Sequence, residues 1–218
     1  MNLYLIRHGE SEGNTGDDWG VDPVLTPHGR RQAECAGEAL RDAGITHLYC
    51  SALRRALESA HIIGQALGLK PEAWPELVEV ADWRMGNQPY TGLPRAEIAA
   101  AFPGMTFREG FPERDWWQIP VEDEVHAYQR ALVVEAELRR RHQDTGDTVA
   151  AVSHGTFGSV LMASLMGLPP RGYTRFSQRN CAISLLELLP GTAKLRFQNR
   201  VEHLPEDGGP YAKRILRP

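Results

Sequence analysis

The stretch Leu3-Tyr4-Leu5-Ile6-Arg7-His8-Gly9-Glu10 is an apolar run that stops at a cation, an imidazole and a glycine. A short apolar run of this kind is typical of a strand buried on both faces. The pattern recurs far downstream, at Val149-Ala150-Ala151-Val152-Ser153-His154-Gly155. Open α/β sheets place their functional groups at the carboxyl ends of the strands. Two buried strands that each end in His-Gly therefore predict an α/β protein with both imidazoles at that edge.

The segments that follow the first strand alternate between helix and strand. Thr26 and Pro27 predict the N-cap and first residue of a helix that stops at Gly44. Residues 45–50 resemble a second strand, and Ser51 is predicted to cap a second helix that stops at Gly68. This rhythm indicates a mostly parallel sheet between helices, a three-layer α/β/α fold.

The second half of the chain continues the pattern after an interruption. Residues 124–142 read as a long helix, which we expect to turn Val125, Tyr128, Leu132 and Ala136 inward. A strand at 148–153, a helix at 156–166 and strands at 182–188 and 195–201 complete the predicted elements.

Residues 82–123 break the rhythm. They carry many Gly and Pro residues, three tryptophans and one short helical candidate near 94–102. Because so long an irregular connection is uncommon in a compact domain, we predict an insertion that caps the site within a single domain, 1–218. The alternative is a surface excursion stabilised by its own tryptophans. Packing is the favoured role for Trp83, Trp116 and Trp117 over a wall for substrate.

Composition excludes several classes of protein. The 218 residues are 42% hydrophobic and 24% charged, as in soluble globular domains, and the net charge of −4 offers no basic surface for nucleic acid or anionic membranes. No apolar run is long enough to span a membrane. The three cysteines are odd in number and lack metal-like spacing, which favours a reduced setting over a disulfide scaffold. Arg7 comes too early in the chain for a secretory signal, so we expect a cytoplasmic protein. The oligomeric state stays open.

The residues at the two strand ends suit phosphoryl transfer. This reaction needs a nucleophile, positive charge around the phosphoryl oxygens and a proton for the leaving oxygen. His8 is the candidate nucleophile, and Arg7 and Arg55 are placed to clamp phosphate oxygens. His154 can hold a second phosphate contact or stabilise developing charge, and Asn14 is a neutral donor. The histidines lack the ligand spacing of metal hydrolases, so no metal is expected in the reaction.

Several ordered motifs cover residues 1–204. They are Arg7-His8-Gly9-Glu10-Ser11 with Asn14, Leu25-Thr26-Pro27 with Gly29, Ser51-Ala52-Leu53-Arg54-Arg55-Ala56, and Val152-Ser153-His154-Gly155. In this order they resemble the histidine phosphatase superfamily, which contains cofactor-dependent phosphoglycerate mutases and many small phosphatases. The resemblance implies the phosphoglycerate mutase-like fold.

The resemblance also assigns roles. It implies that His8 becomes phosphorylated, that Arg7, Arg55 and His154 with Gly155 form the phosphate pocket, and that Asn14 assists. No cofactor is implied.

A general acid normally follows a Leu-x-Glu pattern in this family, which Leu77-Val78-Glu79 matches. The spacing after Glu79 departs from the common pattern, so Asp82 and Glu76 stay as alternatives.

The function implied is a metal-independent phosphatase for a small phosphorylated metabolite. The alternative is a phosphoglycerate mutase, whose characteristic aromatic and arginine stretch is missing between Asp82 and Leu93. A rival of another class is a non-catalytic module that binds a phosphorylated ligand. A direct catalytic role for His203 is not favoured.

Overall fold

The computed structural model describes residues 1–16, 20–80, 90–117, 121–172 and 176–204. Within these residues one seven-stranded sheet has the order β4-β3-β2-β5-β1-β6-β7. The five strands from β4 to β1 run parallel, β6 pairs antiparallel with β1, and β7 pairs antiparallel with β6. The strands are β1 (Asn2–Arg7), β2 (His47–Ser51), β3 (Glu72–Trp74), β4 (Thr106–Phe107), β5 (Thr148–Ser153), β6 (Ile183–Leu189) and β7 (Thr192–Arg200).

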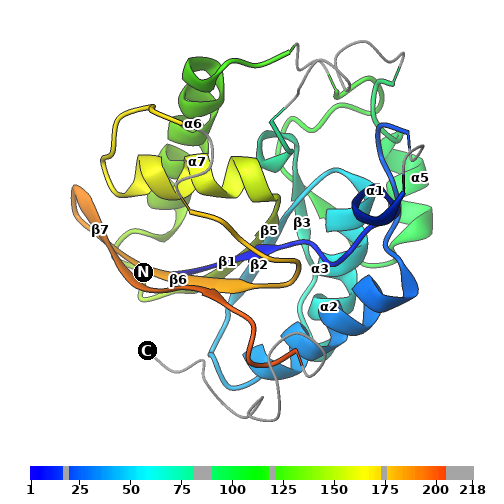
Figure 1. Ribbon diagram of the computed structural model, residues 1–218, viewed down its shortest axis with the longest axis horizontal. Coiled ribbons are helices and arrows are strands. Elements are labelled where there is room, and N and C mark those ends of the chain that lie inside the picture. The colour runs from blue at the N-terminus through cyan, green and yellow to red at the C-terminus, as the bar shows by residue number, and fades with distance from the viewer. Residues whose placement is uncertain (17–19, 81–89, 118–120, 173–175, 205–218) are drawn as a thin grey trace.

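Helices cover both faces of this sheet (Figure 1). One face carries α2 (Pro27–Leu40), α3 (Arg54–Leu67) and α5 (Arg95–Ala101), and the other carries α6 (Glu124–His142) and α7 (Gly155–Leu165). Two shorter elements are α1 (Glu12–Thr15) and the 3-10 turn η1 (Pro75–Leu77). The predicted three-layer α/β/α fold is confirmed.

Strand β1 shows why its sequence is continuously apolar. Leu3 and Leu5 pack in the cluster beneath α6 and α7, whereas Tyr4 and Ile6 pack in the cluster beneath α2 and α3. Because successive side chains of a strand point to opposite faces, a strand in the middle of the layers buries every position. This burial fixes β1, and hence the residues that follow it, in the centre of the sheet.

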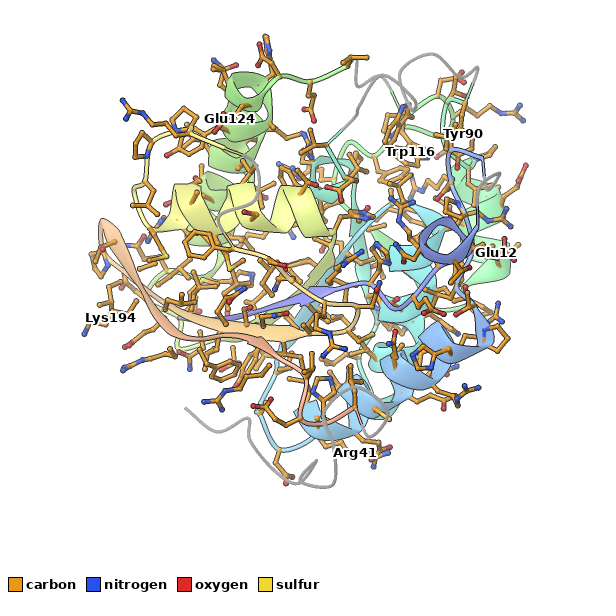
Figure 2. All side chains as sticks on the ribbon, viewed as in Figure 1. Glu12, Arg41, Tyr90, Trp116, Glu124 and Lys194 are labelled. Carbon is orange, nitrogen blue, oxygen red and sulfur yellow. The ribbon has the colours of Figure 1, made fainter. Side chains whose placement is uncertain are left out.

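The helix predicted at 124–142 has the correct ends, with Glu124 at its start (Figure 2). Its predicted inner face is wrong at three of four residues, and only Tyr128 packs against the core as expected. Val125 and Leu132 are 50% and 45% exposed, while Ala127, Ala131 and Val134 are buried. This helix packs against α7, and its buried face runs through Ala127, Ala131, Val134 and Leu138. Because that face holds small as well as large side chains, the positions of the large apolar residues alone do not mark it.

Ser51 does not cap α3 as the sequence predicts. It is the buried last residue of β2, and Leu53 is the N-cap of the helix. The Ser51 hydroxyl oxygen accepts a hydrogen bond from the Leu53 backbone N–H at 3.2 Å and contacts His154. The chain needs two more residues to turn from strand to helix, which leaves Ser51 at the sheet edge.

Part of the predicted capping segment 82–123 belongs to the sheet. Strand β4 pairs with β3, and both are too short to give a periodic pattern. Trp116 and Trp117 are buried with Phe111, which confirms packing for these two, and Trp83 lies outside the described residues. That the segment also covers a site stays a prediction.

Within the residues described, the helices are too short or too polar for any of them to cross a membrane.

Candidate active site

His8 and His154 meet at the carboxyl edge of the sheet. They follow β1 and β5, which are adjacent and parallel. Their ring centroids are 5.0 Å apart and their residues are 3% and 0% exposed. His154 is also the N-cap residue of α7. The parallel pairing of two strands thus brings together imidazoles that are 146 positions apart in the chain.

Two hydrogen bonds determine which nitrogen of His8 carries the proton. Nδ1 lies 2.6 Å from the carbonyl oxygen of Gly9, which can only accept. The Arg55 Nε–H donates to Nε2 at 3.2 Å, and a guanidinium can only donate. Nδ1 is therefore protonated, and the lone pair is on Nε2. A neutral imidazole with a lone pair on Nε2 is a competent nucleophile.

The surroundings keep both imidazoles neutral. Burial, followed by the charges of Arg55 and Arg7, lowers the pKa of His8 well below 6.5, against the opposing effect of its bond to Gly9. Burial and then Arg55 lower the pKa of His154 in the same way. At neutral pH the positive charge of this cluster therefore comes from the two arginines.

Close backbone contact fixes the loop after β1. A Cβ on Gly9 would lie 2.3 Å from the carbonyl oxygen of Gly29 in α2, so only glycine fits. The Gly9 N–H donates to the Ser59 hydroxyl at 3.0 Å, and that hydroxyl donates to the Arg55 carbonyl at 2.7 Å. The loop that carries His8 is thus bonded to the helix that carries Arg55.

Arg55 forms an ion pair with the carboxylate of Asp22, a residue that no sequence motif marks. Asp22 Oδ1 lies 3.7 Å from Arg55 Nη1, and the two side chains are 3% and 9% exposed. The Arg54 backbone N–H donates to the same oxygen at 2.9 Å, and the Tyr90 hydroxyl donates to Oδ2. Asp22 lies in the loop before α2, where no local pattern distinguishes it from other loop carboxylates.

Three buried nitrogens of the cluster have no hydrogen-bond partner among the residues that the structure describes. They are Arg7 Nε, Arg55 Nη1 and His154 Nδ1. The other bonds of these side chains hold them in place: Arg7 Nη1 donates to the Gln178 carbonyl at 2.8 Å, and His154 Nε2 lies 2.7 Å from the Ser51 hydroxyl. Because unsatisfied buried polar groups are costly, such a cluster suits an anion with several acceptor oxygens.

Glu79 lies at the N-terminus of α7. Its Oε1 accepts the backbone N–H groups of Val80 at 2.9 Å and Phe157 at 2.8 Å, and its Oε2 accepts that of Thr156 at 3.2 Å. These bonds place its carboxylate within two residues of His154. Such a position is electrostatically favourable for a carboxylate.

Glu76 and Asp82 are the two alternatives to Glu79 as the general acid, and the structure describes only the first of them. Glu76 Oε1 is paired with Arg108 at 2.6 Å, in an ion pair separate from the contacts of the two imidazoles. Asp82 lies outside the described residues. Of the carboxylates that the structure describes here, Glu79 is the one bonded to the helix that begins beside His154.

Asn14 and Gly155 lie at the borders of the cluster. Asn14 is exposed, and its Oδ1 accepts from the Ser11 N–H at 3.0 Å and from Asn180 Nδ2 at 3.3 Å. The same Asn180 amide donates to the His8 carbonyl at 3.1 Å, so it links Asn14 to the nucleophile loop. Gly155 lies against Arg7, since a Cβ there would be 3.5 Å from Arg7 Nε. Asn180 and Gln178 were missed because the connection before β6 carries no motif.

Comparison with known proteins agrees with this geometry. The family model of the histidine phosphatase superfamily (branch 1) matches residues 3–201. A probable phosphoglycerate mutase GpmB of Yersinia enterocolitica is 29% identical over 202 residues, which are 86% of this chain and 85% of that protein.

Two solved structures are similar over almost their whole length. A mycobacterial glucosyl-3-phosphoglycerate phosphatase in complex with VO3 has a TM-score of 0.68 and 25% identity, covering 92% of this chain and 99% of that one. A putative alpha-ribazole-5'-P phosphatase of Escherichia coli has a TM-score of 0.66 and 26% identity, covering 92% and 96%. The chain belongs to the histidine phosphatase superfamily, and its fold is phosphoglycerate mutase-like.

Proposed function

Given this superfamily, we propose that the protein is a metal-independent phosphatase that hydrolyses a small phosphorylated metabolite through a phosphohistidine on His8. The observation that carries the proposal is the acceptor nitrogen Nε2 of His8 in a cluster with three nitrogens, on Arg7, Arg55 and His154, that have no hydrogen-bond partner within the described part of the chain. A nucleophile next to preorganised donors is the arrangement that phosphoryl transfer requires.

In the first step His8 Nε2 attacks phosphorus while the bond from phosphorus to the leaving oxygen breaks. Arg55 now donates to Nε2, so the incoming phosphoryl group displaces this bond and takes over the guanidinium as its own donor. Arg7 Nε and His154 Nδ1 are available to the other phosphoryl oxygens. The proton on His8 Nδ1 stays bonded to the Gly9 carbonyl, which stabilises the imidazolium formed on transfer.

Glu79 is proposed to act first as the general acid and then as the general base. In its acid form it protonates the departing alkoxide, and as a carboxylate it then takes a proton from the water that attacks the phosphohistidine. Oε2 is the better placed oxygen, because Oε1 already accepts two backbone N–H groups and Oε2 accepts one. Asn14 and Gly155 are assigned supporting contacts at the rim of the phosphate pocket.

A phosphoglycerate mutase is the second candidate, and the similarity to GpmB is the observation that favours it. A mutase returns the phosphoryl group to an acid alcohol held in line with the phosphohistidine and excludes water. Two of the similar solved structures are phosphatases by name, which supports hydrolysis over isomerisation. A module that only binds a phosphorylated ligand would need neither a fixed tautomer on His8 nor a carboxylate at α7.

The test is to trap the intermediate. With 4-nitrophenyl phosphate, whose leaving group needs no proton, Glu79→Gln should release a rapid burst of nitrophenolate and then turn over slowly. Mass spectrometry at neutral or alkaline pH should find phosphate on the peptide that contains His8, because phosphohistidine is labile in acid.

Glu76→Gln is the matched control and should show neither a burst nor accumulated phosphopeptide. His8→Ala should give background turnover and no label. A folded His8→Ala variant that keeps more than a few per cent of activity would rule out the phosphohistidine.

A further inference from the structure

A second cluster of titratable side chains lies at the opposite edge of the sheet from His8 and His154. His47 is the first residue of β2, His142 is the last residue of α6, and Asp147 directly precedes β5. Because the six residues of β5 separate Asp147 from His154, the two sites are roughly 20 Å apart. The cluster of His47, His142 and Asp147 therefore takes no part in the phosphate site.

The donor atoms of these side chains converge. One ligand atom of each lies within 4.8 Å of the others. Asp147 Oδ2 is 2.8 Å from His142 Nδ1 and 4.0 Å from His47 Nδ1. Ligands bonded tetrahedrally to Zn²⁺ at about 2.0–2.1 Å lie about 3.4 Å from one another. The two distances bracket this value. The His47 side chain is 45% exposed, and its Nδ1 would exchange a 2.9 Å contact with the Thr46 hydroxyl for the cation.

We propose that His47, His142 and Asp147 bind a divalent cation of the zinc class. Two imidazoles and one carboxylate are ligands that Zn²⁺ and similar borderline metals prefer, and water can occupy the fourth position. The ligands come from β2, α6 and the turn before β5, so the cation would tie three segments together.

Tyr49 supplies the outer partner that a metal-bound histidine requires. Its hydroxyl lies 2.7 Å from His142 Nε2. When Nδ1 binds the cation, the single ring proton moves to Nε2 and is donated to the Tyr49 oxygen. Metal-bound histidines almost always donate their second nitrogen in this way.

His47 distinguishes a cation site from a cluster that only stabilises the turn between α6 and β5. The bonds of Asp147 to His142 and Thr145 would stabilise the turn between α6 and β5 with no cation present. His47 contributes less to that turn, because its Nδ1 contacts the hydroxyl of the adjacent Thr46 at 2.9 Å and lies 4.0 Å from Asp147, so its removal should matter chiefly when a cation is bound.

The experiment measures thermal unfolding of the whole chain with and without Zn²⁺, after treatment with a chelator. At about a hundred times the dissociation constant, which calorimetry supplies, Zn²⁺ should raise Tm by roughly 5–10 °C. His47→Ala should abolish most of this rise, while lowering the Tm of the metal-free protein, through loss of the contact with Thr46, by much less than the rise itself. Co²⁺ in place of Zn²⁺ should give visible absorption bands that His47→Ala removes.

Two controls exclude other zinc sites. His126→Ala removes an exposed imidazole that lies 2.7 Å from the Asp123 carboxylate, and it should keep the full rise in Tm. His8→Ala removes half of the imidazole pair at the other edge and should keep it too. Absence of a Zn²⁺-dependent rise, its persistence in His47→Ala, or its loss in either control would overturn the proposal. Turnover of 4-nitrophenyl phosphate should be the same in His47→Ala and wild type when a chelator is present.

Discussion

Replacement of Asp22 by asparagine tests how Arg55 is held. The two side chains form a poorly screened pair, with 3.7 Å between Asp22 Oδ1 and Arg55 Nη1 and with 3% and 9% exposure. Removing one partner of a buried pair costs about 3–5 kcal/mol, since the other charge is left uncompensated. We expect the lower end of this range, because the amide oxygen can still accept from the Arg54 N–H.

For a chain of this length, about 3 kcal/mol corresponds to a fall in Tm of roughly 6–12 °C. Phosphate or vanadate supplies the missing negative charge from the other side of the guanidinium. Either anion should therefore raise the Tm of Asp22→Asn by several degrees more than it raises that of the wild type. Catalysis should show a lower KM, from the stronger positive field, together with a lower kcat, from the poorer orientation of Arg55.

The assay is thermal unfolding in a phosphate titration, combined with steady-state kinetics on 4-nitrophenyl phosphate. Tyr90→Phe is the matched control: it removes the hydroxyl bonded to Asp22 but keeps the carboxylate, so its anion-dependent rise in Tm should equal that of the wild type. An Asp22→Asn protein with wild-type Tm and a wild-type response to phosphate would refute the reasoning.

Three further predictions follow from the same site. The pKa of His8 in the folded protein lies below 6.5, so below pH 6.5 the unfolded chain binds a proton that the folded chain does not, and the free energy of unfolding falls as the pH drops. In denaturant titrations at several pH values, His8→Asn should make this fall less steep by up to about 1.4 kcal/mol per pH unit. An identical slope in both proteins would contradict this prediction. In rapid-quench measurements of the phosphorylation step, Glu79→Gln should slow an alkyl phosphate far more than an aryl phosphate, and equal losses would move the acid role elsewhere. Given 3-phosphoglycerate and a bisphosphoglycerate primer, the protein should release inorganic phosphate without forming appreciable 2-phosphoglycerate. Chelators should leave this release of phosphate unchanged. Efficient isomerisation would overturn the choice of phosphatase over mutase.

The sequence alone determined the parts of this protein that have a local signature. Strands β1 and β5 are buried on both faces, so both are continuously apolar, and the His-Gly that ends each one marks the carboxyl edge of the sheet. The helix ends predicted at 124 and 142 coincide with those of α6. The motif around Arg55 identified the residue that bonds His8.

Tertiary structure alone decided the contacts between residues that are far apart in the chain. The tautomer of His8 depends on Arg55, and the placement of Arg55 depends on Asp22 and Tyr90, whose separation of 68 positions leaves no periodic trace. The sequence favoured Glu79 over Glu76 on a motif alone, whereas the structure shows that α7 supplies two backbone donors to Glu79 and that Arg108 pairs with Glu76.

The same reason explains the two predictions that were wrong. Hydrophobicity identified the large apolar residues of α6, yet packing against α7 buries a face that includes Ala127 and Ala131. Ser51 was predicted to cap α3, yet the chain keeps it in β2 and begins the helix after Leu53. Local pattern fixes which segments are buried and where they end, whereas side-chain neighbours across the sheet are set by how the segments pack.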